Sequence, residues 1–437
     1  MRFSTYISVL AGSAIVAAIP GVSDKIQREV ERVARDEPEF AKVIVENITN
    51  ESPKISPKVF IISMFQYEAD IWYDNSDTEG SIGNLLAQNI TVSGFSMLFP
   101  DAHCLADGSV CQLTTGEAEI NAASTIQALM LSPLFNLTET YFMIAGIAGV
   151  NPEYGTLGSV AFSKYAVQVA LQYEFDAREI PDNYSTGYIP LGSDAPDQYP
   201  TSIYGTEVFE VNEALRDIAV NFAIGENYTD SAEAIAYRAN YLNSDIYSAA
   251  TLAPSVIKCD VATSDVYYSG TLLGEAFTNT TSLFTNGSGI YCMTAQEDNA
   301  SLEAMIRASI NGIMDFSRII VMRTASDFDR PYPGVSDEFN LFYADQGGFE
   351  PAIENIYIAG TPVVKGILDG WESTFKAGIN ATNYIGDIFG SLGGEPDFGP
   401  GSSYGGEEVD LNTVGLDRRA LYRKNVSRRT MKGHKKL

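Results

Sequence analysis

Three acidic residues, each placed just after an apolar segment, are the best candidates for chemistry in this chain. Glu68 lies four residues after the apolar run that ends at Met64, Glu297 follows the segment YCMT, and Asp327 follows RIIVM and a turn of small residues. In an open parallel sheet, ligands bind at the carboxyl ends of the strands, so we expect the three carboxylates to meet there. Each acid taken singly is equally compatible with a helix N-terminus, where the helix dipole favours negative charge.

Other catalytic groups are scarce. The chain contains two histidines, His103 and His434, so a Ser-His-Asp triad, a Cys-His nucleophile and a histidine-rich zinc site are all poorly supported. The sequence contains no P-loop, and it lacks the spacing of a dinucleotide fingerprint. We therefore expect no metal and no cofactor, and we expect carboxylates to carry any proton transfer.

A glycine-broken apolar segment must lie at the centre of such a site. Residues Tyr141–Ala145 are bulky and apolar apart from the last, and Gly146 and Gly149 follow. A short apolar run of this kind indicates a strand buried on both faces. Glycines just past its end would let the backbone turn and a flat ligand lie against it. A strand that merely ends in a glycine turn is the alternative interpretation.

Strands and helices are predicted to alternate along the rest of the chain. Further strands are expected at residues 58–64 and 318–322, and helices at 65–73, 118–131, 208–224, 300–316 and 363–375. Residues 74–115 are expected to be rich in loops. This alternation predicts an α/β fold with a mixed, largely parallel sheet flanked by helices.

Charge and composition limit the partners. The formal net charge is −28, which argues against nucleic acid or anionic lipid as a ligand because both need a basic face. After the N-terminal segment, no apolar run approaches the roughly 20 residues that crossing a bilayer takes. The predicted organisation is a signal peptide at 1–18, a leader or linker at 19–55, one domain at 56–385, and a Gly- and acid-rich linker with a basic tail at 386–437.

Several features indicate a secreted or cell-surface protein. Residues 1–18 have a basic start, an apolar centre and a small-residue cleavage site, although an uncleaved apolar helix is the alternative. The four cysteines fall in two near pairs, which favours disulfides Cys104–Cys111 and Cys259–Cys292 over two other connectivities or free thiols. Sequons for N-glycosylation begin at Asn47, Asn50, Asn89, Asn136, Asn183, Asn227, Asn279, Asn286, Asn299, Asn380 and Asn425.

Residues from about 55 to 385 resemble the fungal purine nucleoside permease family, which is similar in fold to nucleoside phosphorylases and methylthioadenosine nucleosidases. KVFIISMFQYE resembles the first strand of the nucleosidases with its catalytic glutamate, which falls on Glu68. RTASDFD resembles the element whose aspartate protonates the purine, here Asp327 with Ser326 beside it. TAQEDNA resembles the element that binds ribose hydroxyls, which gives that role to Glu297 and places Gln296 next to it. The resemblance implies a nucleoside-phosphorylase-like fold.

The central segment carries the rest of the resemblance. IAGIAGVNPEYGTLGSV resembles the Gly-Ala-Gly strand end of these proteins, so substrate binding is expected at Ala148 and Gly149. Phe65 is expected to stack on the ligand, with packing in the core as its alternative role. The chain departs from the family pattern at Gln296, where a methionine would stand, and at Ser159, where an aspartate would stand.

The resemblance implies purine nucleosides as ligands and leaves the reaction open. Residues 63–72 and 131–163 contain no basic residue, whereas phosphorylases place phosphate-binding arginines at the corresponding strands. Water activated by Glu68 is therefore the expected nucleophile, with Asp327 protonating the purine and Glu297 holding the ribose. The alternatives are a non-catalytic nucleoside-binding component working with a membrane transporter, a phosphate-dependent phosphorylase, and an unrelated extracellular role on the same fold. A homodimer is expected by analogy only.

Overall fold

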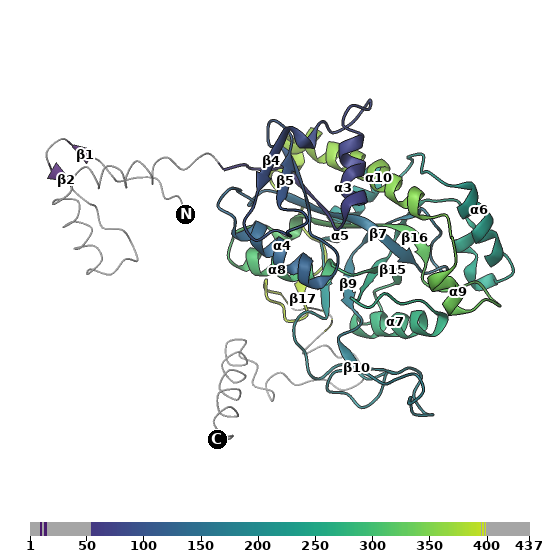
Figure 1. Cartoon of the computed structure of the whole chain (residues 1–437). Coiled ribbons are helices and arrows are strands. Elements are labelled where there is room, and N and C mark those ends of the chain that lie inside the picture. The colour runs from purple at the N-terminus through teal and green to yellow at the C-terminus, as the bar shows by residue number, and fades with distance from the viewer. Residues whose placement is uncertain (1–8, 11–12, 15–53, 395, 397, 399–437) are drawn as a thin grey trace, which may run out of the picture. The chain divides into compact units, whose positions relative to one another are not determined.

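The computed structural model describes residues 9–10, 13–14, 54–394, 396 and 398. Most of the expected signal peptide, the leader up to residue 53 and the basic tail lie outside these residues. The chain divides into two units, residues 1–54 and 55–437. In the first unit, β1 (Val9–Leu10) pairs with β2 (Ser13–Ala14) in antiparallel fashion. The second unit contains the remaining described elements (Figure 1).

A mixed sheet is the centre of the second unit, and thirteen strands belong to it within the described residues. Its strands are β3 (Val59–Ser63), β4 (Gln88–Thr91), β5 (Asp101–Cys104), β6 (Val110–Thr114), β7 (Tyr141–Val150), β8 (Val160–Ser163), β9 (Tyr165–Gln168), β12 (Val208–Glu210), β13 (Val256–Lys258), β14 (Asp260–Thr263), β15 (Tyr291–Ala295), β16 (Ile319–Phe328) and β17 (Gly386–Asp387). Around β7 the sheet is mostly parallel, because β7 pairs in parallel with β3 and β16 and β3 pairs in parallel with β6. The pairing of β7 with β15 at Val150 and Met293 is antiparallel. Towards both edges the pairing becomes antiparallel. A separate hairpin joins β10 (Gln172–Glu174) to β11 (Tyr188–Pro190).

Helices cover both faces of the sheet (Figure 1). The helices are α3 (Gln66–Asp74), α4 (Glu119–Leu131), α5 (Glu213–Ala223), α6 (Ala232–Arg238), α7 (Thr271–Phe284), α8 (Asp298–Ile310), α9 (Asp337–Phe342) and α10 (Phe349–Asp369). Short helical turns also occur at η1 (Leu85–Ala87), η2 (Ala239–Tyr241), η3 (Asp245–Tyr247), η4 (Ala249–Thr251), η5 (Phe316–Arg318) and η6 (Trp371–Phe375). The α/β class and the mixed sheet flanked by helices are therefore confirmed.

The alternation of side chains along a strand assigns the helices to their faces. In β3, Phe60 and Ile62 point into a core shared with α4 and α8, whereas Val59 and Ile61 point into a core shared with α3, α5 and α10. All five residues of β3 are buried, as expected for a central parallel strand covered on both sides. The apolar run in the sequence therefore has no polar face.

The central strand is longer than predicted. β7 continues through both glycines to Val150, so the glycines lie inside the strand and not in a turn after it. β16 also extends beyond the predicted 318–322 and carries Asp327 within it. Both strands gain hydrogen bonds from each other along this extension, which compensates for the low strand preference of glycine.

Other boundaries were also wrong. Residues 74–115 contain β4, β5 and β6, and the segment 208–224 begins with β12 before α5 starts. Asn212 sets that start, because its Oδ1 accepts hydrogen bonds from the N–H groups of Ala214 and Leu215. α10 begins at Phe349, well before residue 363, and it continues through Pro362 because one side of the helix packs on the sheet.

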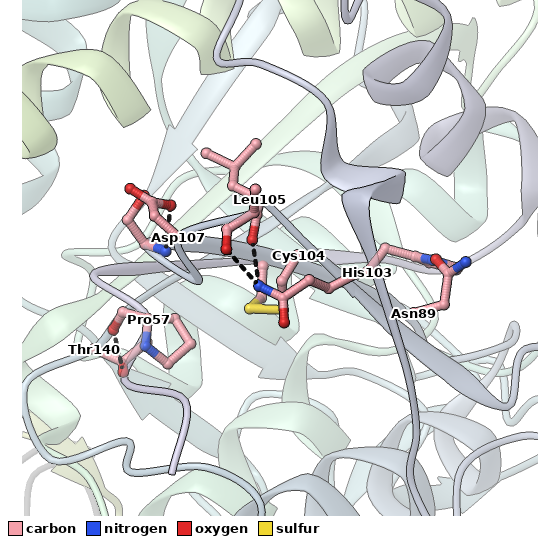
Figure 2. The surroundings of a disulfide bond; sticks show 11 residues. Pro57, Asn89, His103, Cys104, Leu105, Asp107 and Thr140 are labelled. Carbon is pink, nitrogen blue, oxygen red and sulfur yellow. Dashed lines mark hydrogen bonds between the residues drawn. A yellow bond between two sulfur atoms is a disulfide. The ribbon is translucent and has the colours of Figure 1, made fainter. Parts of the chain in front are cut away.

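Both predicted disulfides form. The Cys104–Cys111 bond joins the neighbouring strands β5 and β6. The second bond joins Cys259, the residue just before β14, to Cys292 in β15. Figure 2 shows Cys104 between His103 and Leu105, with His103 beside Asn89 of β4. The described residues contain no free cysteine.

The two disulfides should differ in their contribution to stability. The Cys259–Cys292 bond closes a loop with a sequence separation of 33, against 7 for Cys104–Cys111. Because a longer closed loop removes more entropy from the unfolded chain, the pair C259A/C292A should cost about 1 kcal/mol more than C104A/C111A. Equilibrium urea unfolding of the two variants measures the difference, and equal losses would contradict the loop-length argument.

The predicted sequons differ in accessibility. The side chains of Asn89, Asn136, Asn183, Asn227, Asn286 and Asn380 are exposed. Asn299 is buried at the start of α8 and donates to the carbonyl oxygen of Thr206, so this sequon is closed to a glycan in the folded chain. None of the helices in the described residues combines the length and the apolar character that crossing a bilayer requires.

Candidate active site

A cavity of about 750 Å³ opens at the carboxyl ends of β3, β7 and β16. Each of the residues predicted for the site lines it: Phe65, Glu68, Ala148, Gly149, Gln296, Glu297, Ser326 and Asp327. They come from four segments that are far apart in the sequence and meet because three parallel strands end at one edge. The volume is in the range of small-molecule binding sites.

Glu68 lies in the first turn of α3 and is 1% exposed. Its two carboxylate oxygens accept hydrogen bonds from the backbone N–H groups of Met64, at 2.7 Å, and Ile147, at 2.8 Å. Gly146 leaves the space that the carboxylate occupies, since a Cβ there would lie 2.5 Å from Glu68 Oε1. Burial raises the pKa of Glu68 to about 8, although Arg323 and the two backbone donors oppose the shift.

This buried carboxyl should make stability depend on pH. Below the usual pKa of about 4.5, Glu68 is protonated in both folded and unfolded chains, so its contribution to stability is intact. Between pH 4.5 and 8 the unfolded chain releases the proton and the folded chain keeps it, which favours unfolding by up to about 1.4 kcal/mol per pH unit. Above pH 8 both states are ionised and the loss is complete.

Glu68→Gln removes this titration. We expect the free energy of unfolding of the wild type to fall more steeply than that of Glu68→Gln between pH 5 and pH 8, in urea titrations at several pH values. Other buried acids contribute equally to both proteins and cancel in the difference. Glu79→Gln, a change at an exposed glutamate, should run parallel to the wild type. Parallel curves for Glu68→Gln as well would show that Glu68 is ionised in the folded protein at neutral pH.

Glu297 is held by a buried arginine. Arg323 Nη2 donates to Glu297 Oε2 at 3.1 Å and to Asp298 Oδ1 at 2.7 Å, and its Nε donates to Asp298 Oδ2 at 3.2 Å. The other Glu297 oxygen accepts from the N–H of Ala118 at 2.9 Å. Burial raises the pKa of Glu297, and the neighbouring guanidinium opposes that shift. The carboxylate is therefore fixed at the wall of the cavity.

Asp327 follows an irregularity in the sheet. The register between β16 and β7 shifts between Ala325 and Asp327, and Asp327 then pairs with Gly149. This bulge lets Ser326 and Asp327, consecutive in sequence, touch each other: Ser326 Oγ lies 2.7 Å from Asp327 Oδ1. Burial is the largest effect on Asp327 and raises its pKa.

The remaining predicted residues form the floor and rim of the cavity. Gly149 N–H donates to Thr294 Oγ1 at 2.8 Å, and the carbonyl oxygen of Ala148 accepts from Ser326 Oγ at 3.0 Å. Gln296 donates to the carbonyl oxygen of Asp265 at 3.2 Å, which ties it to the opposite wall. Phe65 packs against the rings of Tyr67 and Phe349 and is half-buried. The ring of Phe65 therefore both packs against these two aromatic rings and lines the cavity.

Arg323 and Tyr267 also line the cavity and are not among the predicted site residues. Arg323 starts the RTASDFD segment but received no role, although an arginine directly after an apolar run must find acidic partners if it is buried. Tyr267, whose hydroxyl lies 3.2 Å from Asp327 Oδ2, also received no role. Within the described residues, no group of His, Cys, Asp and Glu side chains has the arrangement to hold a metal ion.

The fold and the cavity define an α/β protein with a carboxylate-lined site at the ends of parallel strands. Among solved structures, the chain is similar to a 5′-methylthioadenosine/S-adenosylhomocysteine nucleosidase from Helicobacter pylori, with 12% identity and a TM-score of 0.43, over 72% of this chain and 99% of that chain. It is also similar to the futalosine hydrolase of Helicobacter pylori, with 12% identity and a TM-score of 0.41, over 72% of this chain and 97% of that chain.

Sequence relatives are much closer. A purine nucleoside permease of Candida albicans is 48% identical over 348 residues, which span 78% of this chain and 83% of that protein. A probable purine nucleoside permease of Schizosaccharomyces pombe is 40% identical over 323 residues, which span 72% of this chain and 90% of that protein. The family model for purine nucleoside permease matches residues 56–380. The chain belongs to the purine nucleoside permease family.

Proposed function

We propose that this protein binds purine nucleosides outside the cell and hydrolyses their N-ribosidic bond, which supports the uptake of the products. The observation that carries the proposal is the pair of acids, Glu68 and Asp327, fixed on two sides of β7 and lining one cavity. Two carboxyl groups with raised pKa values are suited to one taking and one giving a proton.

In this reaction Glu68 removes a proton from water while the water oxygen attacks C1′ of the ribose. The bond between C1′ and the purine nitrogen breaks, and Asp327 gives its proton to the departing base. A glutamate with a pKa near 8 holds the proton taken from water better than an ordinary glutamate does, although a smaller fraction of it is ionised at neutral pH. Glu297 accepts hydrogen bonds from the ribose hydroxyls.

The charge distribution of the cavity supports water over phosphate as the nucleophile. Among the cavity-lining residues, all of which lie in the described part of the chain, Arg323 carries the only cationic side chain. Its hydrogen bonds go to Glu297, Asp298 and the carbonyl oxygen of Ile147. A guanidinium occupied by two carboxylates is poorly placed to hold an incoming phosphate dianion.

A second candidate is a non-catalytic nucleoside-binding component of an uptake system. The names of the relatives favour it, since both the Candida albicans and the Schizosaccharomyces pombe proteins are described as permeases. In that case the cavity would deliver nucleosides to a membrane transporter. Secretion, glycosylation and a homodimer remain predictions; the two disulfides fit an oxidising compartment.

The deciding experiment incubates the protein with inosine, adenosine and guanosine and follows the free base, with phosphate present and with phosphate removed enzymatically. Base release at equal rates in both conditions is the result that we expect. Base release that depends on phosphate would show that the protein is a phosphorylase and not a hydrolase. Nucleoside binding in calorimetry without base release would favour the binding component.

A further inference from the structure

Tyr267 bridges solvent and the proposed acid. It lies in the segment between β14 and α7, and its residue is 64% exposed although its hydroxyl reaches Asp327 Oδ2 at 3.2 Å. The residue lines the cavity together with Asp327 and Ser326. A side chain that is open to water at one side and bonded to a carboxyl group at its tip can connect the two.

The segment that carries Tyr267 is anchored. Ser264 N–H donates to the carbonyl oxygen of Ala295 at 2.9 Å, and Val266 N–H donates to Ser264 Oγ at 3.0 Å. Asp265 is held from two further elements, by the Glu119 N–H at 2.8 Å and by the Gln296 side chain at 3.2 Å. The phenol is therefore positioned by its surroundings, unlike a surface tyrosine on a free loop.

The hydrogen atoms around Asp327 can be counted. Ser326 Oγ has one hydrogen but lies within reach of two acceptors, the Ala148 carbonyl oxygen at 3.0 Å and Asp327 Oδ1 at 2.7 Å. The serine hydrogen can turn to Oδ1 both when Asp327 is ionised and when Asp327 carries its proton on Oδ2. Ser326 therefore fits both protonation states of Asp327, and Oδ2 is left to Tyr267.

We propose that Tyr267 is the positioning residue of the acid: its hydroxyl orients Asp327 and returns the proton that the purine takes away in each turnover. This inference rests on the proposed function. The phenol passes its hydrogen to Asp327 Oδ2 while it accepts one from a solvent water, so no tyrosinate accumulates. Glu68 meanwhile releases to solvent the proton that it took from the attacking water. Protons therefore balance over the cycle.

The electrostatics agree with a relay that stays neutral. The neighbouring Asp327 carboxylate is the largest effect on Tyr267 and raises its pKa, which disfavours a lasting tyrosinate. The hydrogen bond from Tyr267 in turn lowers the pKa of Asp327, against the effects of burial and of Asp329. Ser326 also contacts Asp327, Tyr237 feels its charge, and Thr294 Oγ1 and Asp327 Oδ2 both lie near the position that a Cβ at Gly149 would take.

Tyr267→Phe tests the proposal with two substrates. For adenosine we expect kcat to fall about 10- to 100-fold with little change in KM, because Asp327 is oriented less well and reprotonated more slowly. Nicotinamide riboside carries a cationic base that leaves as a neutral molecule and needs no proton, so its cleavage should change less than about 3-fold. Tyr204→Phe, a change at a tyrosine of matching exposure outside the cavity, should leave both rates unchanged. Equal losses on both substrates would overturn the proposal, because they would indicate a structural role.

A second readout needs no turnover. Calorimetry of adenine binding in two buffers of different ionisation enthalpy measures proton uptake, whose pH midpoint should move upwards in Tyr267→Phe because Asp327 loses a donor to its ionised form. If the wild type releases no base but this shift occurs, hydrolysis fails and the link between Tyr267 and Asp327 stands. If the wild type releases base and neither the midpoint nor the substrate difference changes, the Tyr267 proposal alone is overturned.

Discussion

Asp327→Asn is expected to lower kcat for purine nucleosides by about 10²–10⁴-fold while the Kd for the nucleoside changes less than about tenfold. An amide has nearly the shape of the carboxyl group, but its single oxygen can accept from only one of Ser326 and Tyr267, and it cannot give a proton to the departing base. Glu68→Gln should produce a loss of similar size, because the amide cannot take a proton from water. Stopped-time assays of base release, with calorimetric titration of the nucleoside, measure both quantities.

Asp182→Asn is the matched control, since it makes the same change at an exposed aspartate outside the cavity and should keep full activity. Nicotinamide riboside again separates the two acids: its cleavage should survive Asp327→Asn and fail with Glu68→Gln. A binding protein without catalysis would give a different pattern. It would release no base, and each substitution would change only its affinity for the nucleoside, by a modest factor. Full activity of Asp327→Asn on adenosine would remove Asp327 from the mechanism.

Arg323→Met should lower the free energy of unfolding by about 3–5 kcal/mol. The guanidinium is 2% exposed and faces Glu297 and Asp298, whose side chains are 5% and 0% exposed. Removing it leaves two buried carboxylates without a counter-charge, and methionine restores only the volume of the aliphatic stem. Equilibrium unfolding at neutral pH measures the loss.

Arg307→Met provides the comparison. Arg307 pairs with Glu303 one helical turn away, but its side chain is 66% exposed, so this substitution should cost less than about 0.5 kcal/mol. Acidification supplies a further check: the deficit of Arg323→Met should shrink towards pH 5 as the orphaned carboxyl groups take up protons. A deficit independent of pH would indicate lost packing in place of uncompensated charge.

The sequence predicted the convergence of Glu68, Glu297 and Asp327, because each follows an apolar run and the ends of parallel strands share one edge. It failed where the answer lay in distant contacts. Gly146 and Gly149 looked like the end of a strand, since glycine weakens isolated strands. In the folded chain β3 and β16 flank β7. Glu68 and Met64 fill the space of a Cβ at Gly146, and a Cβ at Gly149 would lie 3.0 Å from Thr294 Oγ1 and 3.3 Å from Asp327 Oδ2.

Arg323 and Tyr267 show the same limit. The partner that lets Arg323 be buried, Asp298, lies 25 residues earlier, at the start of another helix. Tyr267 stands in the connection between β14 and α7, and only the sheet brings it to Asp327, 60 residues away. Local patterns report the preference of a segment, whereas these two residues owe their positions to the packing of whole elements.

The bulge between Ala325 and Asp327 has a consequence for how such a protein can diversify. Because the register of β16 on β7 sets the direction of Asp327, the proposed acid belongs to the rigid frame of the sheet. Other walls of the cavity, including Gln346 and Phe349, come from a connecting segment and the start of α10. Substitution of these wall residues can therefore change which base is accepted while the position of Asp327 is unchanged. Proteins of this fold can in this way come to bind different ligands and keep the same reaction.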